Sequence, residues 1–366
     1  MPDESILVIN TGSSSLKFGL YTVTGSEPKL SLEGQADGIG HNTGNLELKD
    51  ASGKTLHSAT HSFKTQTEAL THVTQLPALA QIHPTAVGHR VVHGGPRLTT
   101  HQCITPNLLT ELKACLHFAP LHIPLSLELI EAAQRSYPNL PQFACFDTAF
   151  HTTIPEAASR FPLPRELYDE GIRRYGFHGL SYESIVHQLA PNIPDRTIIA
   201  HLGSGASLCA LRAGRSIDTT MGLTPTGGIP MATRSGDLDP GILLYLMRVK
   251  HMDADSLEQL LNHNSGLKAI SGGTSDMREL EASNTPEAGL AIDIFTTAIR
   301  KAIAAYTAEL GGLDLLIFSG GIGEHSERIR NAVSIGISAP IRTIPSQEDL
   351  QIARHVHTLK NQRPAT

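Results

Sequence analysis

A Gly/Ser-rich turn occurs twice along the chain, and this repeat constrains the fold more than any other feature of the sequence. The first copy spans residues 8–17 (VINTGSSSLK), and the second spans residues 201–208 (HLGSGASL). Each turn joins two apolar segments, so residues 6–23 and 197–211 are each expected to form a β-hairpin. Backbone N–H groups and hydroxyls, with an ammonium in the first copy, suit a phosphoryl group. The repeat therefore predicts a duplicated domain with a nucleotide held between the halves.

Length and composition narrow the class of protein. The chain has 366 residues, more than a single hydrophobic core usually supports, so two domains are expected. Its net charge of −6 lacks the basic excess of a nucleic-acid-binding protein. We expect no membrane partner, because no apolar run is long enough for a bilayer and the acidic N-terminus does not resemble a secretory signal. Four widely spaced cysteines indicate neither a zinc site nor a disulfide framework, so a cytoplasmic location is expected.

Apolar periodicity and turn residues predict further α/β elements in both halves. Buried strands are expected at residues 85–92, 142–147 and 313–318, with short strand-like pieces at residues 28–65. Residues 107–135 have a largely helical pattern that is interrupted near Pro120 and Pro124. A long helix is expected at residues 287–310, because one of its faces is apolar and Gly311-Gly312 ends it.

Two arginines stand where an anion could bind. Arg90 ends an expected strand, and its guanidinium could bind a carboxylate or phosphate in a bidentate manner. A structural ion pair explains its position equally well. Arg234 lies in a polar loop, and such loops hold ligands more often than cores do. Together the two guanidinium groups would neutralise a phosphoryl group in transfer.

An acid and a histidine are candidates for the same chemistry. Asp147 ends an expected strand, where a carboxylate commonly faces a ligand crevice and suits Mg²⁺. A helix N-cap explains Asp147 at least as well. His178 is flanked by glycine and lies near Arg174, which suits anion binding, and His122 is a further candidate. No histidine pair has the spacing of an HExxH metal site.

The segments that carry these residues resemble the motifs of the acetate kinase family. The motifs lie in the family's order along nearly the whole chain, at residues 8–17, 88–95, 146–151, 174–179, 201–203, 233–240 and 321–324. One such motif is weakly specific, but seven in order are highly specific. The resemblance implies an α/β fold of two duplicated ribonuclease-H-like, actin-like ATPase domains around a nucleotide cleft. It also implies an N-terminal domain of residues 1–148 plus 347–366 and a C-terminal domain of residues 149–346.

The resemblance implies roles for individual residues as well. Asn10 and Glu348 would hold the metal, Mg²⁺ or Mn²⁺. Catalysis would depend on Asp147 near the metal, on the two arginines Arg90 and Arg234, and on His178 as a transition-state stabiliser. The substrate would be bound by Arg90 together with Val92, Leu121, His122, Phe177 and Pro225. ATP or ADP would be bound by Lys17, Ser13, Ser15, His201, Gly203, Ser204, Asp276, Arg278, Gly321, Ile322 and His325.

The implied activity is reversible phosphoryl transfer from ATP to acetate, which gives acetyl phosphate and ADP. A carboxylate needs no general base to act as a nucleophile, so such a site must mainly bring two anions together and neutralise them. We expect direct in-line transfer, and a phosphoenzyme on Asp147 is the alternative. The implied partners are acetate or another short-chain carboxylate, ATP or ADP, and a second copy of the chain in a homodimer.

Departures from the family pattern leave the substrates open. Ser204 and His325 each replace a common Asn, Thr226-Gly227 replaces Leu-Glu, and Met277 replaces Phe. Because several of these lie in the nucleotide half, another nucleotide or pyrophosphate is an alternative donor. Val92 favours acetate over propionate, but a propionate or butyrate kinase of the same fold stays an alternative. A non-catalytic nucleotide-binding protein is the less favoured one.

Overall fold

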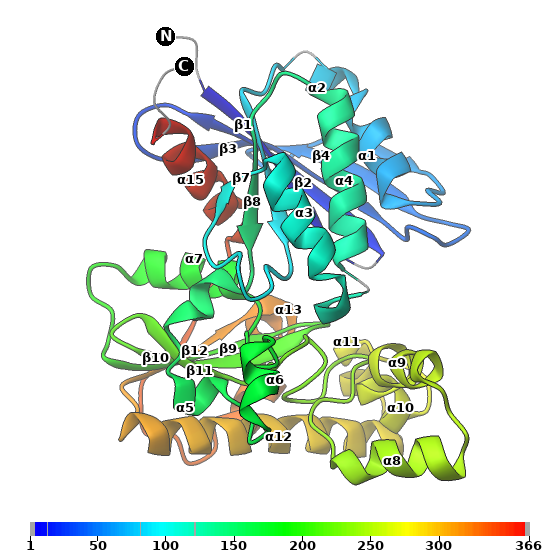
Figure 1. The fold of residues 1–366 in the computed structure, drawn as a ribbon, viewed down its shortest axis with the longest axis vertical. Coiled ribbons are helices and arrows are strands. Elements are labelled where there is room, and N and C mark those ends of the chain that lie inside the picture. Colours follow the sequence, from blue (N-terminus) through cyan, green and yellow to red (C-terminus); the bar gives the residue numbers. More distant parts are fainter. Residues whose placement is uncertain (1–3, 13, 81, 121, 363–366) are drawn as a thin grey trace. The chain divides into compact units, whose positions relative to one another are not determined.

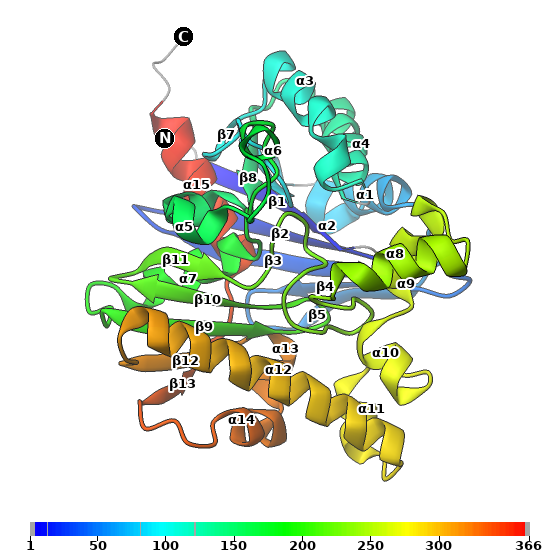
Figure 2. The same cartoon turned by 60° about the horizontal axis from the view of Figure 1, so that its bottom comes forward.

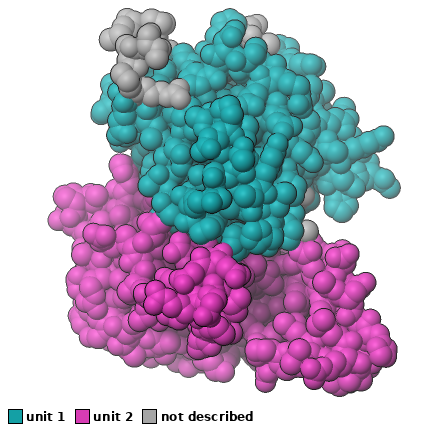
Figure 3. Space-filling model, in the orientation of Figure 1, with its two compact units in different colours: residues 1–149, 347–366 teal, residues 150–346 magenta. Residues whose placement is uncertain are grey.

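The computed structural model describes residues 4–12, 14–80, 82–120 and 122–362 (Figure 1). The chain forms two compact units, which Figure 3 colours separately: unit 1 is Met1–Ala149 with Gln347–Thr366, and unit 2 is Phe150–Ser346. Unit 1 is thus assembled from both ends of the chain, whereas unit 2 is continuous. Of the helices formed by the described residues, none combines the length and apolar character that a bilayer span requires.

Unit 1 is built on a mixed sheet whose order, over the described residues, is β5-β4-β3-β2-β1-β6-β8-β7. Strands β1 to β5 form an antiparallel meander, and β6 and β8 extend the sheet in parallel with β1. The carboxyl ends of β1, β6 and β8 therefore lie at one edge, which places Asn10, Arg90 and Asp147 near one another. The strands are β1 (Glu4–Thr11), β2 (Ser15–Val23), β3 (Pro28–Asp37), β4 (Asn45–Asp50), β5 (Thr55–Thr60), β6 (Ala86–Val91), β7 (Gln102–Cys103) and β8 (Gln142–Phe146).

Helices cover both faces of this sheet (Figure 1). On one face α1 and α4 pack against apolar side chains of β1 and β2. On the other face α15 approaches the strands closely, because Gly88 has no side chain: a Cβ there would lie 2.7 Å from Ile352 and from Val356. The helices of unit 1 are α1 (Gln66–Thr74), α2 (Pro77–Ala80), α3 (Pro106–Ala114), η1 (Leu116–Phe118), α4 (Ile123–Ser136) and α15 (Glu348–Asn361), and η2 (Ala149–Thr153) follows β8 across the boundary of the units.

Unit 2 repeats the core topology of unit 1. Its sheet has the order β11-β10-β9-β12-β13 over the described residues, with an antiparallel hairpin in the middle and two parallel strands beyond it. The segment β3-β2-β1-β6-β8 of unit 1 has the same order and the same strand directions. The predicted α/β fold of duplicated ribonuclease-H-like units is therefore confirmed. The strands are β9 (Arg196–Leu202), β10 (Ala206–Arg212), β11 (Arg215–Thr219), β12 (Leu315–Ser319) and β13 (Ile341–Thr343).

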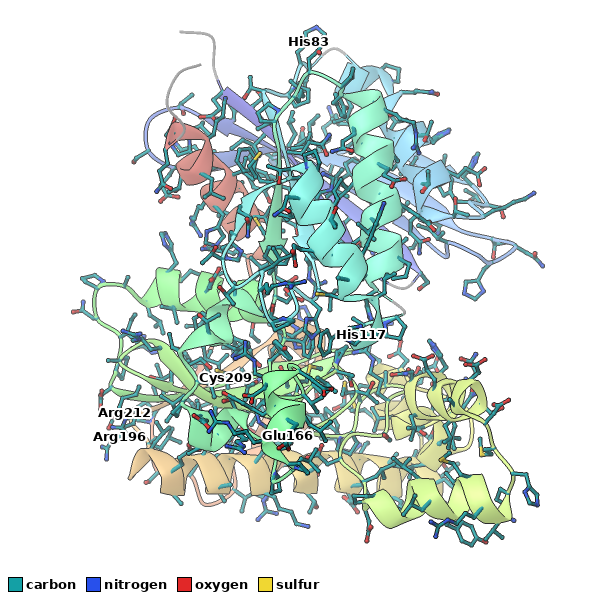
Figure 4. The ribbon with its side chains drawn as sticks, in the orientation of Figure 1. His83, His117, Glu166, Arg196, Cys209 and Arg212 are labelled. Carbon is teal, nitrogen blue, oxygen red and sulfur yellow. The ribbon has the colours of Figure 1, made fainter. Side chains whose placement is uncertain are left out.

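Helices α7 and α12 lie on opposite faces of the unit 2 sheet (Figure 2). The predicted apolar face of α12 is buried, and Gly311 ends the helix with φ 71°. Figure 4 places Cys209 inside this unit and Arg196 and Arg212 together at the open end of the β9–β10 hairpin. The helices are α5 (Glu156–Ser159), α6 (Arg165–Asp169), α7 (Gly179–Leu189), α8 (Pro240–Val249), α9 (Ala254–His263), α10 (Gly266–Ser271), α11 (Met277–Ala282), α12 (Pro286–Leu310), α13 (Gly320–His325) and α14 (Glu327–Val333).

The predicted hairpins, buried strands and long helix are confirmed, and one detail of the prediction was wrong. Residues 28–65 form strands of up to ten residues rather than short pieces, because they extend the hairpin of β1 and β2 into a meander. The predicted interruption near Pro120 and Pro124 is confirmed, because α3 ends at Ala114 and α4 begins only at Ile123. Pro124 lies in the first turn of α4, where the N–H that proline lacks would have no helical acceptor.

Candidate active site

The first Gly/Ser turn connects β1 to β2. The Gly12 N–H donates to the Ser15 carbonyl at 3.0 Å, which closes the turn. A Cβ at Gly12 would lie only 2.8 Å from Ser15 Oγ, so the close packing of the turn favours glycine. Lys17 follows on β2 with an exposed side chain. Ser13, also predicted to bind the nucleotide, lies outside the described residues.

Arg90 and Asp147 form a forked ion pair at the carboxyl ends of β6 and β8. Arg90 Nη2 donates to Asp147 Oδ2 at 2.6 Å, and Arg90 Nε donates to the same oxygen at 3.1 Å. The Asp147 side chain is 1% exposed and that of Arg90 is 16% exposed. The ion pair that was one explanation of Arg90 is therefore present. It lies among other polar groups that the sequence also predicted to be functional.

Asn10 links this ion pair to two acids at the start of α15. Its Oδ1 accepts from Arg90 Nη1 at 3.2 Å, and its Nδ2 donates to Asp349 Oδ1 at 2.7 Å and to Glu348 Oε2 at 3.4 Å. Asp349 was missed by the sequence prediction, although it directly follows Glu348. Carboxylate and amide oxygens are the ligands that Mg²⁺ and Mn²⁺ prefer, so these residues fit a divalent cation.

Burial and charge act against each other in this cluster. Burial alone would lower the pKa of Arg90, but the carboxylates of Asp147, Glu348 and Asp349 outweigh it and raise that pKa above its ordinary value. Burial also raises the pKa of Asp349, against the lowering effect of the hydrogen bond from Asn10. Because several carboxyl groups surround one guanidinium, the cluster favours an additional cation.

His178 is the N-cap of α7 in unit 2, and a serine hydroxyl on β10 contacts its ring. Its backbone is left-handed, with φ 58°. His178 Nδ1 lies 2.8 Å from Ser207 Oγ on β10, and the ring stacks on that of His201 with 4.5 Å between centroids. His201 Nδ1 in turn lies 2.8 Å from Ser181 Oγ. Two of the predicted residues, His178 and His201, are therefore brought together beside the second Gly/Ser turn.

Arg234 joins His178 at this turn. A Cβ at Gly205 would lie 3.2 Å from His178 Nε2 and 3.6 Å from Arg234 Nη1. Arg234 Nη1 also donates to the Pro225 carbonyl at 3.2 Å, which fixes the guanidinium in place. An imidazole and a guanidinium that gather over one glycine suit an anion whose charge increases during a reaction.

A buried histidine supports the loop that precedes His178. His151 Nε2 lies 3.0 Å from the Phe177 carbonyl, and Nδ1 lies 2.9 Å from Ser216 Oγ. Because a carbonyl can only accept, the ring proton is on Nε2 and the Ser216 hydroxyl donates to Nδ1. Burial lowers the pKa of His151 to about 4, so the ring is neutral near pH 7.

Arg174, expected to assist His178 with an anion, has a structural role instead. Its Nη1 donates to the carbonyls of Thr219 at 2.7 Å and Thr220 at 3.1 Å, and its Nε donates to the Ala158 carbonyl. The guanidinium therefore ties together the backbone around β11. The sequence could not distinguish this role from anion binding, since both place an arginine beside glycine-rich backbone.

The remaining predicted nucleotide residues occur in three places in unit 2. Gly203 and the exposed Ser204 form the turn between β9 and β10, and Gly321 and Ile322 lie in α13, which the exposed His325 ends. Asp276 is the N-cap of α11 and forms an ion pair with Arg278 at 2.5 Å, although the Arg278 side chain is 90% exposed.

The end of β12 comes close to the end of β9. Gly320 has φ 74°, and a Cβ there would lie 2.7 Å from the Leu202 carbonyl. Its N–H donates to Glu324 Oε1 at 3.0 Å. The adjacent Ser319 hydroxyl is buried without a hydrogen-bond partner among the described residues. This close approach brings the glycines of α13 next to the second Gly/Ser turn.

The predicted substrate residues belong to both units. In unit 1, Val92 directly follows β6 and His122 is the N-cap of α4, and both are half-buried. In unit 2, Phe177 and Pro225 are buried. Leu121 lies outside the described residues.

A cavity of about 850 Å³ lies elsewhere in unit 2, between the C-terminal half of α12 and residues 333–339. Its lining includes Arg300, Ile303 and Ile335, but none of the predicted site residues that the structure describes. This cavity is therefore separate from the clusters described above.

The repeated sheet order, with a Gly/Ser turn in each copy, places the chain in the actin-like class of kinases and ATPases. The model of the Acetokinase family matches residues 5–339. The chain belongs to this family, so the resemblance of its motifs is confirmed. An acetate kinase of Rhodopseudomonas palustris is 42% identical over 97% of this chain and 98% of that protein. An acetate kinase of Shewanella frigidimarina is 43% identical over 91% of this chain and 86% of that protein.

Solved structures give the same result. The acetate kinase of Porphyromonas gingivalis has a TM-score of 0.85 and 30% identity, and the match covers 98% of this chain and 100% of that one. A propionate kinase from Francisella tularensis has a TM-score of 0.87 and 34% identity, with 96% and 98% of the two chains covered. Membership of the family implies a carboxylate and an adenine nucleotide as substrates and, typically, a divalent metal ion.

Proposed function

We propose that the chain catalyses reversible, Mg²⁺-dependent phosphoryl transfer from ATP to acetate, which gives acetyl phosphate and ADP. The observation that carries this proposal is the cluster of Asn10, Arg90, Asp147, Glu348 and Asp349 at one edge of the unit 1 sheet. A guanidinium beside several acids can bind an anion while the acids hold a cation. Relatives named acetate kinase over nearly the whole chain support the same activity.

The reaction requires charge neutralisation rather than a general base. Acetate is ionised at neutral pH, so its oxygen is already a nucleophile. Arg90 would bind the acetate carboxylate, and Arg234 would bind the migrating phosphoryl group, which lowers the repulsion between the two anions. Asp147 would hold the Arg90 guanidinium in position. Mg²⁺, held by Asn10 and Glu348 with Asp349 as an added carboxylate, would neutralise charge on the phosphate oxygens.

Arg234 and His178 would stabilise the transition state. Both place a nitrogen over Gly205, where donors can meet charge that develops on the phosphoryl oxygens. By analogy with arginine fingers, Arg234→Ala should lower kcat by roughly 10³-fold or more. Arg215→Ala, at an exposed position on β11, is the matched control and should retain kcat. A loss below about tenfold for Arg234→Ala would exclude this role.

Direct in-line transfer is favoured over a phosphoenzyme on Asp147. The Asp147 carboxylate already accepts three hydrogen bonds from Arg90, at 2.6, 3.1 and 3.2 Å, and both of its oxygens are engaged, which makes it a poor nucleophile. One direct transfer inverts the configuration at phosphorus. A single turnover with a chiral γ-phosphate should therefore give inversion, and net retention would support the phosphoenzyme instead.

The acyl group and the phosphoryl donor are specified by different residues. Val92, with Leu121, His122, Phe177 and Pro225, would surround the methyl group of acetate. One methylene in an apolar pocket is worth about 1–3 kcal/mol, so acetate should be preferred over propionate by roughly 10- to 200-fold. Ser204 and His325 are exposed near the glycines of α13, where they would contact the nucleotide and affect the choice of donor.

We further propose that the two units act as the two actin-like domains and that the chain forms a homodimer through unit 2. Helix α8 has no buried residue, and its exposed side chains include Leu244, Tyr245 and Val249. Such an apolar helix face is costly to leave in water and is typical of an interface. Sedimentation should therefore give a dimer, and Tyr245→Glu should shift the mass toward the monomer.

A hydroxamate assay tests the activity most simply. The purified chain is incubated with ATP, GTP or pyrophosphate against acetate, propionate or butyrate, and acyl phosphate is trapped as the hydroxamate. The highest kcat/KM is expected for ATP with acetate. A higher value for propionate or pyrophosphate would reassign the substrate, and no hydroxamate with any pair would favour a non-catalytic nucleotide-binding protein.

A further inference from the structure

Tyr182, Ser207 and His178 form a chain of hydrogen bonds inside unit 2. Tyr182 Oη lies 2.5 Å from Ser207 Oγ, and Ser207 Oγ lies 2.8 Å from His178 Nδ1. Tyr182 and Ser207 are fully buried, and His178 is 9% exposed. His178 is the N-cap of α7 and Tyr182 lies in the first turns of that helix, so both side chains reach Ser207 on β10 from the N-terminal end of α7.

The direction of the protons follows from the acidity of these groups. A phenol, with an ordinary pKa of about 10, is a stronger donor and a weaker acceptor than a serine hydroxyl. Tyr182 therefore donates to Ser207 Oγ, and the single proton of the Ser207 hydroxyl is left to donate to His178 Nδ1. When Nδ1 accepts, a neutral imidazole carries its proton on Nε2.

Nε2 is the nitrogen that lies against the second Gly/Ser turn, 3.2 Å from the place of a Cβ at Gly205. We propose that Tyr182 is a positioning residue: through Ser207 it holds His178 as the Nε2–H tautomer, so that the neutral ring donates to an anion bound beside Gly205. The inference rests on the proposed function only for the identity of that anion, the phosphoryl group. The tautomer itself is a property of the protein without substrate.

The neighbours of His178 explain why a neutral donor suits this position. The guanidinium of Arg234 lies over the same glycine, so a second positive charge on the His178 ring would be repelled. His201 also stacks on the ring and is itself oriented by Ser181. An Nε2–H group on a neutral ring adds a hydrogen bond to an anion without adding to this repulsion.

The tautomer can be measured by ¹⁵N NMR of the imidazole nitrogens in the full chain, with His178→Gln used to assign the signals. The parent protein should show His178 protonated on Nε2 at pH 8. Tyr182→Phe removes the donor to Ser207, so the Ser207 hydroxyl can accept instead, and the Nδ1–H form should increase. An Nδ1–H ring in the parent, or unchanged tautomer populations in Tyr182→Phe, would overturn the inference. Because this measurement needs no turnover, it is independent of the proposed acetate kinase activity.

Kinetics provide the second test. Removing a partner that orients a functional imidazole typically lowers activity by about 10- to 100-fold. Tyr182→Phe should therefore lower kcat about tenfold at pH 8 with little change in KM. The ratio of the parent's kcat to that of Tyr182→Phe should fall toward one as the pH is lowered. The reason is that a doubly protonated imidazole carries a proton on Nε2 regardless of its hydrogen bond with Ser207. Ser207→Ala should give the same pH pattern and serves as the second variant if Tyr182→Phe does not fold.

Tyr175→Phe is the matched control. It removes another buried tyrosine hydroxyl of unit 2, which donates to the Gly171 carbonyl at 2.9 Å. The ratio of the parent's kcat to that of Tyr175→Phe should stay constant from pH 8 to pH 5.5. A Tyr182→Phe ratio that is equally constant with pH would mean that Tyr182 only packs, and the inference would be wrong.

Discussion

Replacing Gly176 by alanine should destabilise unit 2 and displace His178 at the same time. Gly176 has φ 74°, a left-handed conformation that glycine adopts readily and alanine does not. A Cβ at this position would lie 2.5 Å from Thr219 Cγ2 and 2.6 Å from His151 Cδ2. His151 cannot move away freely, because it is hydrogen-bonded to Ser216 and to the Phe177 carbonyl.

The expected cost has two parts. The left-handed backbone costs alanine about 1–2 kcal/mol. Overpacking against a fixed ring and a methyl group costs about 1–3 kcal/mol. Together these predict a loss of roughly 2–5 kcal/mol of unfolding free energy, which for a unit of this size corresponds to a fall in Tm of about 4–20 °C. Because the loop carries Phe177 and His178, kcat should fall as well.

Gly289→Ala is the control, because it is the same glycine-to-alanine substitution but should change the stability in the opposite direction. Gly289 lies inside α12, and a Cβ there would meet no atom within 4 Å. Alanine is better than glycine in a helix by about 0.5–1 kcal/mol, so this variant should melt slightly higher and keep its activity. Thermal denaturation and steady-state kinetics of both variants make the comparison. An unchanged Tm for Gly176→Ala would refute the argument from φ and from the Cβ contacts.

Three further predictions concern charge and burial. Arg90→Lys should lower kcat/KM for acetate by about 10- to 100-fold, because lysine cannot fork onto a carboxylate, whereas Arg196→Lys at a more exposed ion pair should not; steady-state kinetics of both variants decide this. His151→Gln should be less stable than the parent, and this difference in unfolding free energy should shrink by about 3 kcal/mol from pH 6.5 to 4. The parent loses stability over this range because His151 takes up a proton in the unfolded state, whereas the buried ring, with a pKa of about 4, resists protonation in the folded state. Urea denaturation at several pH values measures the difference, and a constant difference would contradict the prediction. In the native chain a thiol reagent should label Cys103 before the buried thiols such as Cys209, and equal labelling would be the contrary result.

Local sequence patterns predicted the architecture well. The two hairpins, the buried strands and α12 depend on short-range signals: alternating apolar residues, a helical apolar face, and glycines such as Gly311 where the backbone turns left-handed. The repeat of the Gly/Ser turn revealed the duplication, because it stands at the same place in both sheets. These features depend on neighbours within a few residues, which a single sequence displays.

Contacts between distant parts of the chain were harder to predict. Asp349 binds Asn10, 339 residues away, because α15 packs against β1, and no local pattern shows this. The hydrogen bond from Tyr182 to Ser207 likewise depends on how α7 crosses β10. Arg174 was misinterpreted for the same reason: its carbonyl partners on β11 come from a segment more than forty residues away.

The reverse reaction tests the central claim most directly. The purified chain is mixed with acetyl phosphate, ADP and Mg²⁺, and the phosphorus species are followed by ³¹P NMR. ATP should appear as acetyl phosphate disappears, and Arg234→Ala should lose this conversion. Release of inorganic phosphate at the same rate with and without ADP, and no ATP, would contradict it.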